Sequence, residues 1–250
     1  MNRPINELPA GLFFVGTDTD VGKTYCAAEL LEILQKRGLK LGAYKPCASG
    51  VAVQMPSQSI DKSSDAFLLC QAAGLHLSLM DRVCPQSFQA PLAPPIAAAL
   101  EGRTVDQDRL VTGAAWWNDH CQFLLVEGAG GILSPITESW TVADLAVQLQ
   151  LPLVLVAANR LGCVSQVLAA AEAIASRSLR LQAVILNAFH SGAVRPTSHH
   201  LTTEAQTSEK LLAIDYLEIT HRTNHQLIEQ FLPGIPIFKS ARQLASLIES

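Results

Sequence analysis

The chain has 250 residues, of which 49% are apolar, and a formal net charge of −4 at pH 7. This length and composition fit one large α/β domain with a sizeable core, and the charge gives no electrostatic footprint for nucleic acid. No apolar stretch approaches the roughly 18 residues that a membrane span requires, and the N-terminus lacks the basic start and apolar core of an export signal. We therefore expect a single domain over residues 1–250 that stays in the cytoplasm without nucleic-acid or membrane partners.

Short runs of Val, Leu and Ile alternate with helical patterns along the chain. In chain order we expect a strand at Leu12–Val15, a helix at Lys23–Arg37, a strand at Leu41–Tyr44, helices at Asp65–Ala73 and Asp106–His120, a strand at Phe123–Val126, a helix at Val142–Gln150, a strand at Leu153–Ala157, a helix at Val164–Ser176, a strand at Ala183–Leu186 and a weaker strand at Ile235–Phe238. Continuously apolar strands separated by helices predict a mostly parallel central sheet with helices on both faces. Ligands collect at the carboxyl ends of such strands. The polar stretch 190–207 is expected to be an exposed loop.

The first strand is followed directly by Gly16–Thr24, which reads GTDTDVGKT, and then by a helical pattern that Gly38 ends. A glycine-rich turn between a strand and a helix points backbone N–H groups inward, and a lysine and a hydroxyl at its end complete a triphosphate and metal cradle. The Gly-Lys-Thr triplet alone is a weak signal, because five residues separate Gly16 from Gly22 where the usual motif has about four. The strand and helix around it favour a nucleotide site, and hence an α/β fold of the P-loop NTPase type, over an ordinary corner.

Two further strand candidates end in charged residues. Lys45 follows the second strand, in AYKPCASG, and Glu127 follows the strand Phe123–Val126, in VEGAGG. Lys45 fits either a surface charge or, as we favour, a second cation over the phosphates. Glu127 fits a solvated strand end or an acid that organises magnesium beside a P-loop.

Other residues near these strand ends are less specific. Asp65, in DKSSDAFLLC, is explained almost as well by a helix start capped by Ser63 or Ser64 as by metal binding. Two small-residue loops, Cys47–Gly50 and Gly128–Gly131, would let backbone amides approach an anion.

The cysteines and histidines carry little information about function. The six cysteines contain no Cys-x-x-Cys pair and lie mostly in apolar surroundings, which predicts reduced core residues. His199 and His200 are adjacent, and His221 and His225 are four residues apart. Because no carboxylate or cysteine completes a ligand set, a solvated helix face is favoured over a zinc site.

Five segments together resemble a known family. They read GTDTDVGKT, GAYKPCASG, SSDAFLL, LLVEGAGG and ANRLGCVSQVL, and their order and intervals between Leu12 and Asn187 are similar to those of dethiobiotin synthetase, the ATP-dependent carboxylase that acts just before the last step of biotin synthesis. In that family the interval Gly-x5-Gly-Lys-Thr is the normal form. The resemblance implies one P-loop domain of this kind over residues 1–250.

The resemblance also implies a three-stage reaction with ATP and Mg²⁺. Carbon dioxide, supplied as CO2 or bicarbonate, adds to one amine of 7,8-diaminononanoate to give a carbamate. The carbamate oxygen attacks the γ-phosphate of ATP. The second amine then closes on the carbamic-phosphoric anhydride, which releases phosphate and leaves ADP and a cyclic urea.

Residue roles follow from the resemblance, position by position. Lys23 would hold the β- and γ-phosphates, and Lys45 would neutralise the carbamate and the transferring phosphoryl group. Thr24, Asp65 and Glu127 would organise magnesium. The expected nucleotide contacts are Thr17, Asp18, Thr19, Asp20, Val21, Gly22, Lys23, Thr24, Asn187, which would read the adenine edge, and by position alone Pro236 and Ile237. The expected substrate contacts are Thr19 and Ser49 for the diamine end and its carbamate, Gly130 and Gly131 through their amides, and Gly162, Cys163, Val164 and Ser165.

The last four residues would start a helix that receives the distant carboxylate of the substrate from the neighbouring subunit, since the family is a homodimer. Such a position suits the dipole of a helix N-terminus. In this chain Ser165 stands where an asparagine is familiar, and FQAPLAPPIAA keeps the proline-rich character of the substrate-side loop without its familiar Ser-Pro-His.

Three rival interpretations differ in class. A regulatory ATPase of the MinD and ParA kind carries a signature lysine five positions before the P-loop lysine, and here that position is Asp18. An amidotransferase synthetase of the cobyrinate kind needs an attached glutaminase, for which the chain has no room. A catalytically silent regulatory copy is disfavoured because Lys23, Lys45 and Glu127 are all retained.

Overall fold

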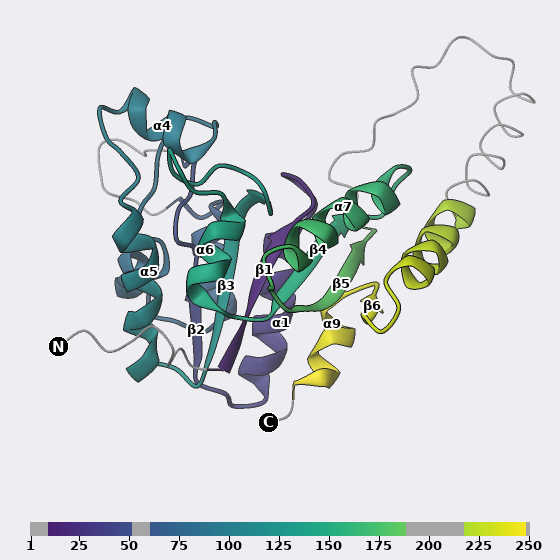
Figure 1. Ribbon diagram of the computed structural model, residues 1–250. Coiled ribbons are helices and arrows are strands. Elements are labelled where there is room, and N and C mark those ends of the chain that lie inside the picture. The colour runs from purple at the N-terminus through teal and green to yellow at the C-terminus, as the bar shows by residue number, and fades with distance from the viewer. Residues whose placement is uncertain (1–9, 52–60, 189–217, 249–250) are drawn as a thin grey trace, which may run out of the picture.

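The computed structural model describes residues 10–51, 61–188 and 218–248. Within these ranges six strands form one parallel sheet in the order β2-β3-β1-β4-β5-β6 (Figure 1). The strands are β1 Ala10–Gly16, β2 Leu41–Tyr44, β3 Phe123–Gly131, β4 Leu153–Ala158, β5 Leu181–Asn187 and β6 Ile237–Phe238. The α/β fold with a parallel central sheet is confirmed.

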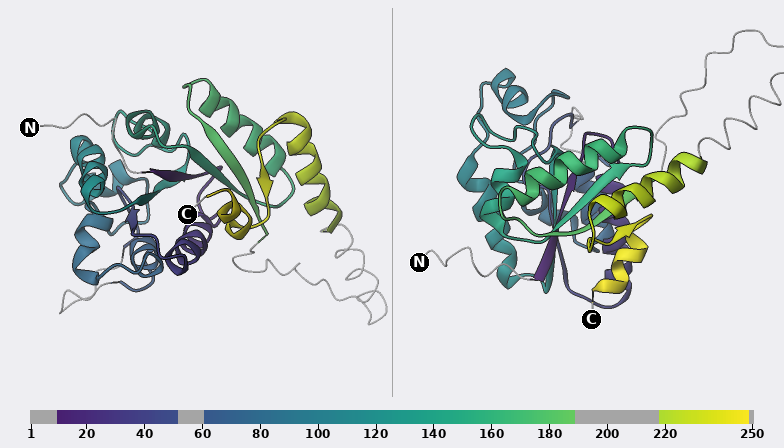
Figure 2. Two further views of the ribbon diagram at one scale, coloured as in Figure 1. Left: turned by 90° about the horizontal axis from the view of Figure 1, so that it is seen from below. Right: turned by 45° about the vertical axis from the view of Figure 1, so that its right-hand side comes forward.

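Helices cover both faces of the sheet. They are α1 Lys23–Lys36, α2 Asp65–Ala72, α3 Met80–Val83, α4 Pro94–Leu100, α5 Gln107–Ala115, α6 Val142–Leu149, α7 Cys163–Ala175 and α9 Ala241–Leu244, with 3-10 turns η2 Leu77–Leu79, η3 Trp116–Asp119 and η4 Ala245–Leu247. Residues 218–231 are also helical. Figure 2 shows α1 and α2 on one face of the sheet and α6 and α7 on the other.

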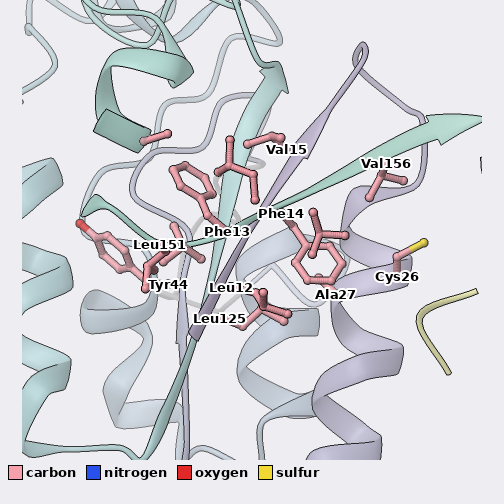
Figure 3. Packing of buried hydrophobic residues seen from close by; sticks show 14 of the residues in the cluster. Leu12, Phe13, Phe14, Val15, Cys26, Ala27, Tyr44, Leu125, Leu151 and Val156 are labelled. Carbon is pink, nitrogen blue, oxygen red and sulfur yellow. The ribbon is translucent and has the colours of Figure 1, made fainter. Parts of the chain in front are cut away.

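The core is centred on β1, because both faces of this strand are covered. The side chains of Phe13, Phe14 and Val15 have no exposed surface. Figure 3 shows Phe13 and Phe14 on opposite sides of the strand, with Phe14 toward Ala27 of α1. Successive side chains of a strand alternate between faces, so a strand covered by helices on both sides needs a continuous apolar run. Full burial of each such phenylalanine contributes about 1.5–3 kcal/mol.

Most predicted elements are confirmed, and the differences have local causes. The third strand does not end at Val126 but continues to Gly131, so the expected loop Gly128–Gly131 is wrong. Its last residue pairs with Gly16, and a Cβ at Gly131 would lie 3.0 Å from the carbonyl oxygen of Thr17. Small residues therefore let β3 pass close to the P-loop and remain paired with β1.

The helix expected over Asp106–His120 is divided. Asp106 is its cap, since its carboxylate accepts a hydrogen bond from Arg109 N at 2.9 Å, and the regular helix α5 gives way to the 3-10 turn η3 at Trp116. The proline-rich segment that was expected to be a loop contains α4, with proline in its first turn. Proline is favoured there because its φ is already helical and the missing N–H has no helical partner.

The cysteine prediction agrees with the structure. All six cysteines are free, and all but the half-buried Cys84 are buried. Burial raises the pKa of Cys26, Cys47 and Cys84 to about 12. In the described ranges no group of three or more His, Cys, Asp or Glu side chains is placed to hold a metal ion.

No helix in the described part of the chain is long and apolar enough to cross a membrane. The stretch 190–207, with His199 and His200, lies outside the described residues. His225 lies in the helical segment 218–231, and its Nε2 is 3.1 Å from the carbonyl oxygen of Ile237.

Candidate active site

The glycine-rich turn lies between β1 and α1. Gly22 has φ 89° and ends the turn, and Lys23 is the first residue of α1. The Lys23 ammonium folds back and donates a hydrogen bond to the carbonyl oxygen of Asp18 at 3.0 Å. Burial lowers the pKa of Lys23, and the nearby carboxylate of Glu127 only partly opposes this. The lysine is thus partly desolvated and positioned over the turn.

Asn187, at the end of β5, packs directly beneath this turn. Its side-chain nitrogen donates to the carbonyl oxygen of Val21 at 3.0 Å, and 6% of its surface is exposed. A Cβ at Gly22 would overlap the Asn187 amide. Position 22 therefore requires glycine both for its positive φ and for this close approach.

Lys45, which directly follows β2, lies between the carboxylates of Asp65, the first residue of α2, and Glu127, within β3. Its Nζ is 2.6 Å from Asp65 Oδ2 and 2.5 Å from Glu127 Oε1. Thr24 Oγ1, in the first turn of α1, donates to the same Glu127 oxygen at 2.9 Å. The register explains the meeting, because Tyr44 pairs with Val126 and the next residue of each strand is Lys45 or Glu127.

Burial and ion pairing together set the charges of this cluster. Glu127 has no exposed surface and Lys45 has 3%, whereas 46% of the Asp65 side chain is exposed. Burial opposes the charge of Lys45, but the two carboxylates outweigh it and raise the pKa of the ammonium. Burial raises the pKa of Glu127, with Lys45 opposing. Burial also acts to raise the pKa of Asp65, but the charge and hydrogen bond of Lys45 outweigh it and hold this pKa below its usual value.

Asp65 also begins α2, as its sequence context allows. The hydroxyl of Ser64 accepts a hydrogen bond from Phe67 N at 3.3 Å, so Ser64 is the cap of this helix. The solvated strand end considered for Glu127 is excluded by its burial. Two of the residues expected to hold a metal therefore have structural roles as well: Asp65 begins a capped helix, and both Asp65 and Glu127 form ion pairs with Lys45.

A cavity of about 810 Å³ opens at this edge of the sheet. Both Lys23 and Lys45 line it, so the two ammonium groups face one space. Its wall also includes Thr19, Asp20, Gly22, Thr24, Tyr25, Ala48, Ser49, Asp65, Pro91, Leu92, Ala93, Pro94, Glu127, Ala129, Gly130, Ser134, Pro135 and Asn187. A smaller cavity of about 440 Å³, near the amino ends of the strands, has no titratable side chain in its wall.

Gly130 and Gly131 were both expected to offer backbone amides to the substrate. Gly131 N donates to Ser134 Oγ at 2.8 Å, so this amide is already bonded within the protein. Ser134 was not predicted as a site residue, although it follows GAGGIL by one position and lines the cavity. A small hydroxyl residue just after the glycine run is the signal that could have indicated it.

Pro236 and Ile237 lie further from the carboxyl edge of the sheet, where the cavity is, than expected. The Pro236 carbonyl oxygen accepts a hydrogen bond from Val184 N at 2.9 Å, and that of Ile237 lies 3.1 Å from the ring of His225. Ile237 pairs with Val184, which lies three positions before Asn187 on β5. Neither residue lines the cavity.

The helix start at Gly162–Ser165 lies apart from the cavity. Gly162 has φ 90° and caps α7 without a side-chain hydrogen bond, and the preceding Leu161 is 89% exposed. None of the four residues lines the cavity of its own chain.

The remaining P-loop positions have varied environments. Asp18 and Asp20 are exposed, Val21 is buried, and Thr19 N donates to Asp18 Oδ1 at 2.7 Å. The hydroxyl of Thr17 is buried and has no hydrogen-bond partner among the described residues.

The donor set around Glu127 fits a magnesium ion. Thr24 offers a hydroxyl, and Asp65 and Glu127 offer carboxylates, which are the oxygen ligands that Mg²⁺ takes. Glu127 Oε2 is buried without a hydrogen-bond partner in the described part of the chain. An unpaired buried carboxylate oxygen is costly, and a cation beside it would remove that cost.

The parallel sheet, the glycine-rich turn at the end of β1 and the lysine that follows it define a protein of the P-loop NTPase type. A family model described as an AAA domain matches residues 10–236. Three relatives, each named ATP-dependent dethiobiotin synthetase BioD, match most of the chain. The relative from Rhodopirellula baltica is 42% identical over 189 residues, 71% of this chain and 73% of its own. That from Caulobacter vibrioides is 41% identical over 178 residues, 70% and 78%.

The third relative, from Anaeromyxobacter dehalogenans, is 36% identical over 239 residues, 95% of this chain and 96% of its own. The chain therefore belongs to the dethiobiotin synthetase family and is an enzyme of the ligase class.

Proposed function

We propose that this protein catalyses the ATP- and magnesium-dependent closure of 7,8-diaminononanoate with CO2 to dethiobiotin, ADP and phosphate. The observation that carries the proposal is the convergence of Lys23, Lys45 and two carboxylates on one cavity at the carboxyl ends of neighbouring strands. The names of the relatives support the same reaction.

The P-loop would bind the triphosphate. The N–H groups of the first turn of α1 have no helical partners and suit an anion, and Lys23 would move from the Asp18 carbonyl to the β- and γ-phosphates. Thr24, Asp65 and Glu127 would hold Mg²⁺, which when bound neutralises charge on the phosphate oxygens. Asn187, already at the rim of the cavity, would lie at the adenine edge.

Lys45 would act on the transferring group. Its raised pKa keeps it cationic at neutral pH, and its burial leaves little water to screen its charge. In such a setting a fixed cation stabilises the charge that develops on a carbamate and on a phosphoryl group in flight. Phosphoryl transfer needs mainly alignment and dispersed positive charge, which this cluster can supply.

The bond changes follow the order that the resemblance implies. Nitrogen of the first amine bonds to CO2 and loses a proton, and the carbamate oxygen then bonds to the γ-phosphorus as the bond to ADP breaks. The second amine attacks the carbamate carbon and loses a proton, phosphate leaves and takes the former carbamate oxygen with it, and the ring closes. Thr19 and Ser49, both on the cavity wall, would hold the diamine end through these steps.

The far end of the substrate is proposed to reach a second subunit. The start of α7 does not line the cavity of its own chain, yet its glycine cap leaves an exposed helix N-terminus. In a homodimer, Gly162–Ser165 of one protomer would receive the carboxylate of a substrate bound in the other.

One assay tests the proposal. The purified chain is incubated with MgATP, bicarbonate and 7,8-diaminononanoate, and ADP and dethiobiotin are quantified by chromatography and mass spectrometry. We expect equal amounts of both products and none of the cyclic urea when the diamine is omitted. Nucleotide hydrolysis that does not depend on the diamine would instead support a regulatory ATPase.

A further inference from the structure

Ser134 lies in the turn between β3 and α6 and faces the cavity. It is half-buried, and its backbone is fixed at both ends, since Ser134 N donates to the Gly131 carbonyl oxygen at 3.0 Å and the Ser134 carbonyl oxygen accepts from Val142 N at 3.0 Å. Its Oγ accepts a third hydrogen bond, from Gly131 N at 2.8 Å. These three bonds hold the side chain in one place.

The hydroxyl hydrogen of Ser134 remains available. A serine hydroxyl carries one donor and two acceptor positions. One acceptor position is used by Gly131 N, and no described residue accepts a hydrogen bond from Ser134 Oγ. Because the side chain lines the cavity, the natural acceptor is a bound molecule.

A second hydroxyl faces the same spot. A Cβ built on Gly130 would lie 2.5 Å from Ser134 Oγ and 3.6 Å from Thr19 Oγ1, so both oxygens flank the space beside this glycine. Gly130 has φ 71° and no side chain to separate them. Neither hydroxyl belongs to the ion-paired cluster of Lys45.

We propose that the Ser134 hydroxyl donates a hydrogen bond to the oxygen that stays on the substrate carbon, first in the carbamate and then in the cyclic urea. This inference rests on the proposed function. The starting diamine has no oxygen at its reacting end, and its amines, while protonated, are donors only and offer no acceptor for this bond. The contact therefore arises only after CO2 has been added, and it favours the carboxylated forms over the free diamine.

Calorimetry with two ligands tests the assignment. Wild type, Ser134→Ala and Ser134→Thr are each titrated with dethiobiotin and, separately, with 7,8-diaminononanoate, in the presence of MgADP. We expect Ser134→Ala to bind dethiobiotin about tenfold more weakly, as for the loss of one hydrogen bond, and to bind the diamine within about twofold of wild type. Ser134→Thr, which keeps the hydroxyl, should restore dethiobiotin affinity.

Ser139→Ala is the matched control. Ser139 lies in the same turn region, its Oγ donates to Gln107 Oε1 at 3.3 Å, and it does not line the cavity. This variant should bind both ligands as wild type does. If alanine at position 134 prevents folding, Ser134→Cys carries the same comparison, since a thiol keeps the volume but is a weak donor.

The outcomes separate the inference from its premise. Equal weakening of diamine and dethiobiotin by Ser134→Ala would show that Ser134 only holds the turn, and an unchanged dethiobiotin affinity would remove the contact; either overturns the inference alone. A wild-type protein that binds neither ligand would overturn the proposed function together with it.

Discussion

The carboxyl edge of the sheet has two halves of different character. In one half, the buried ions Lys45 and Glu127 lie just after β2 and within β3, and the P-loop lysine follows β1. At the ends of β4 and β5 the buried polar side chains are neutral amides: Asn224 Nδ2 donates to Asn159 Oδ1 at 2.9 Å, and Asn159 N donates to the Asn187 carbonyl oxygen at 2.8 Å. The charged half suits transfer of a phosphoryl group, whereas the neutral half joins the helical segment 218–231 to the sheet.

The largest effect is expected from breaking the ion pair of the charged half. Lys45→Met leaves the Glu127 carboxylate buried without its cation, and loss of one partner of a buried pair costs about 3–5 kcal/mol. Urea unfolding followed by circular dichroism measures this loss. The double variant Lys45→Met/Glu127→Leu removes both charges and should regain most of the stability; a double variant no more stable than the single one would contradict this explanation.

The next largest effect concerns catalysis in the same half. Lys45→Ala should lower turnover by at least about a hundredfold, the scale of one lost transition-state charge contact, while nucleotide affinity changes only slightly. Steady-state kinetics and nucleotide titration measure the two quantities. Lys40→Ala is the control: it removes an exposed lysine at the opposite end of β2 from Lys45, and its turnover and nucleotide affinity should match those of wild type. Loss of nucleotide affinity in Lys45→Ala would assign this lysine to binding.

A smaller effect is expected from the neutral half. Asn224→Ala removes hydrogen bonds to Asn159 Oδ1 and to the Arg160 carbonyl oxygen. The Arg160 carbonyl still accepts from Cys163 N, whereas the buried Asn159 amide oxygen loses the bond from Asn224. We expect a loss of about 1–3 kcal/mol in the free energy of unfolding and turnover within about twofold of wild type. Thr223→Ala, on the same helical segment, removes only hydrogen bonds to its own helix and serves as the control. A large fall in turnover would mean that the two halves are not separable.

The smallest effect lies outside both halves, in the capping box of α6. Asp144 Oδ2 accepts from Thr141 N at 2.7 Å and from Thr141 Oγ1 at 2.6 Å. Burial acts to raise the pKa of Asp144, but the hydrogen bonds from Thr141 together outweigh it and lower the pKa. Asp144→Ala should cost about 1 kcal/mol of stability at pH 7.

The pH dependence of this contribution has a definite sign. Because the folded pKa is the lower one, the stabilisation is complete above the unfolded value of about 4 and is lost as pH falls through the folded pKa. Below pH 4 the difference between wild type and Asp144→Ala should therefore shrink. Chemical unfolding at pH 7 and pH 3 checks it, and a difference that grows at low pH would contradict the assignment.

What the sequence predicts well is what local pattern determines. The strand Leu41–Tyr44 has the expected bounds, and Lys45 and Glu127 meet because β2 and β3 are parallel and Tyr44 pairs with Val126. The pairing of Lys45 with Asp65 and Glu127 was not predicted, since each residue had been assigned to phosphates or metal. Partner choice depends on distances that neighbours in sequence do not determine.

Other features depend on contacts between distant segments. Asn187 packs under Gly22 because β5 ends beneath the P-loop, and no pattern around either residue indicates this approach. Ser134 Oγ accepts the hydrogen bond of the Gly131 amide because the chain turns toward α6 directly after β3. The register of β6 against β5 determines how far Pro236 lies from the carboxyl edge of the sheet. The sequence of a two-residue strand does not reveal this register.

The buried free cysteines can report on local opening of the segments that contain them. Cys26 lies in α1, Cys47 follows Lys45 closely, and Cys163 begins α7, and all three are fully or almost fully buried. Since only an exposed thiolate reacts quickly with an alkylating reagent, each thiol should be modified at a rate set by the opening of its own segment. Pulsed alkylation with peptide mapping would thus compare the motions of the P-loop helix, the Lys45 segment and α7 without any added label.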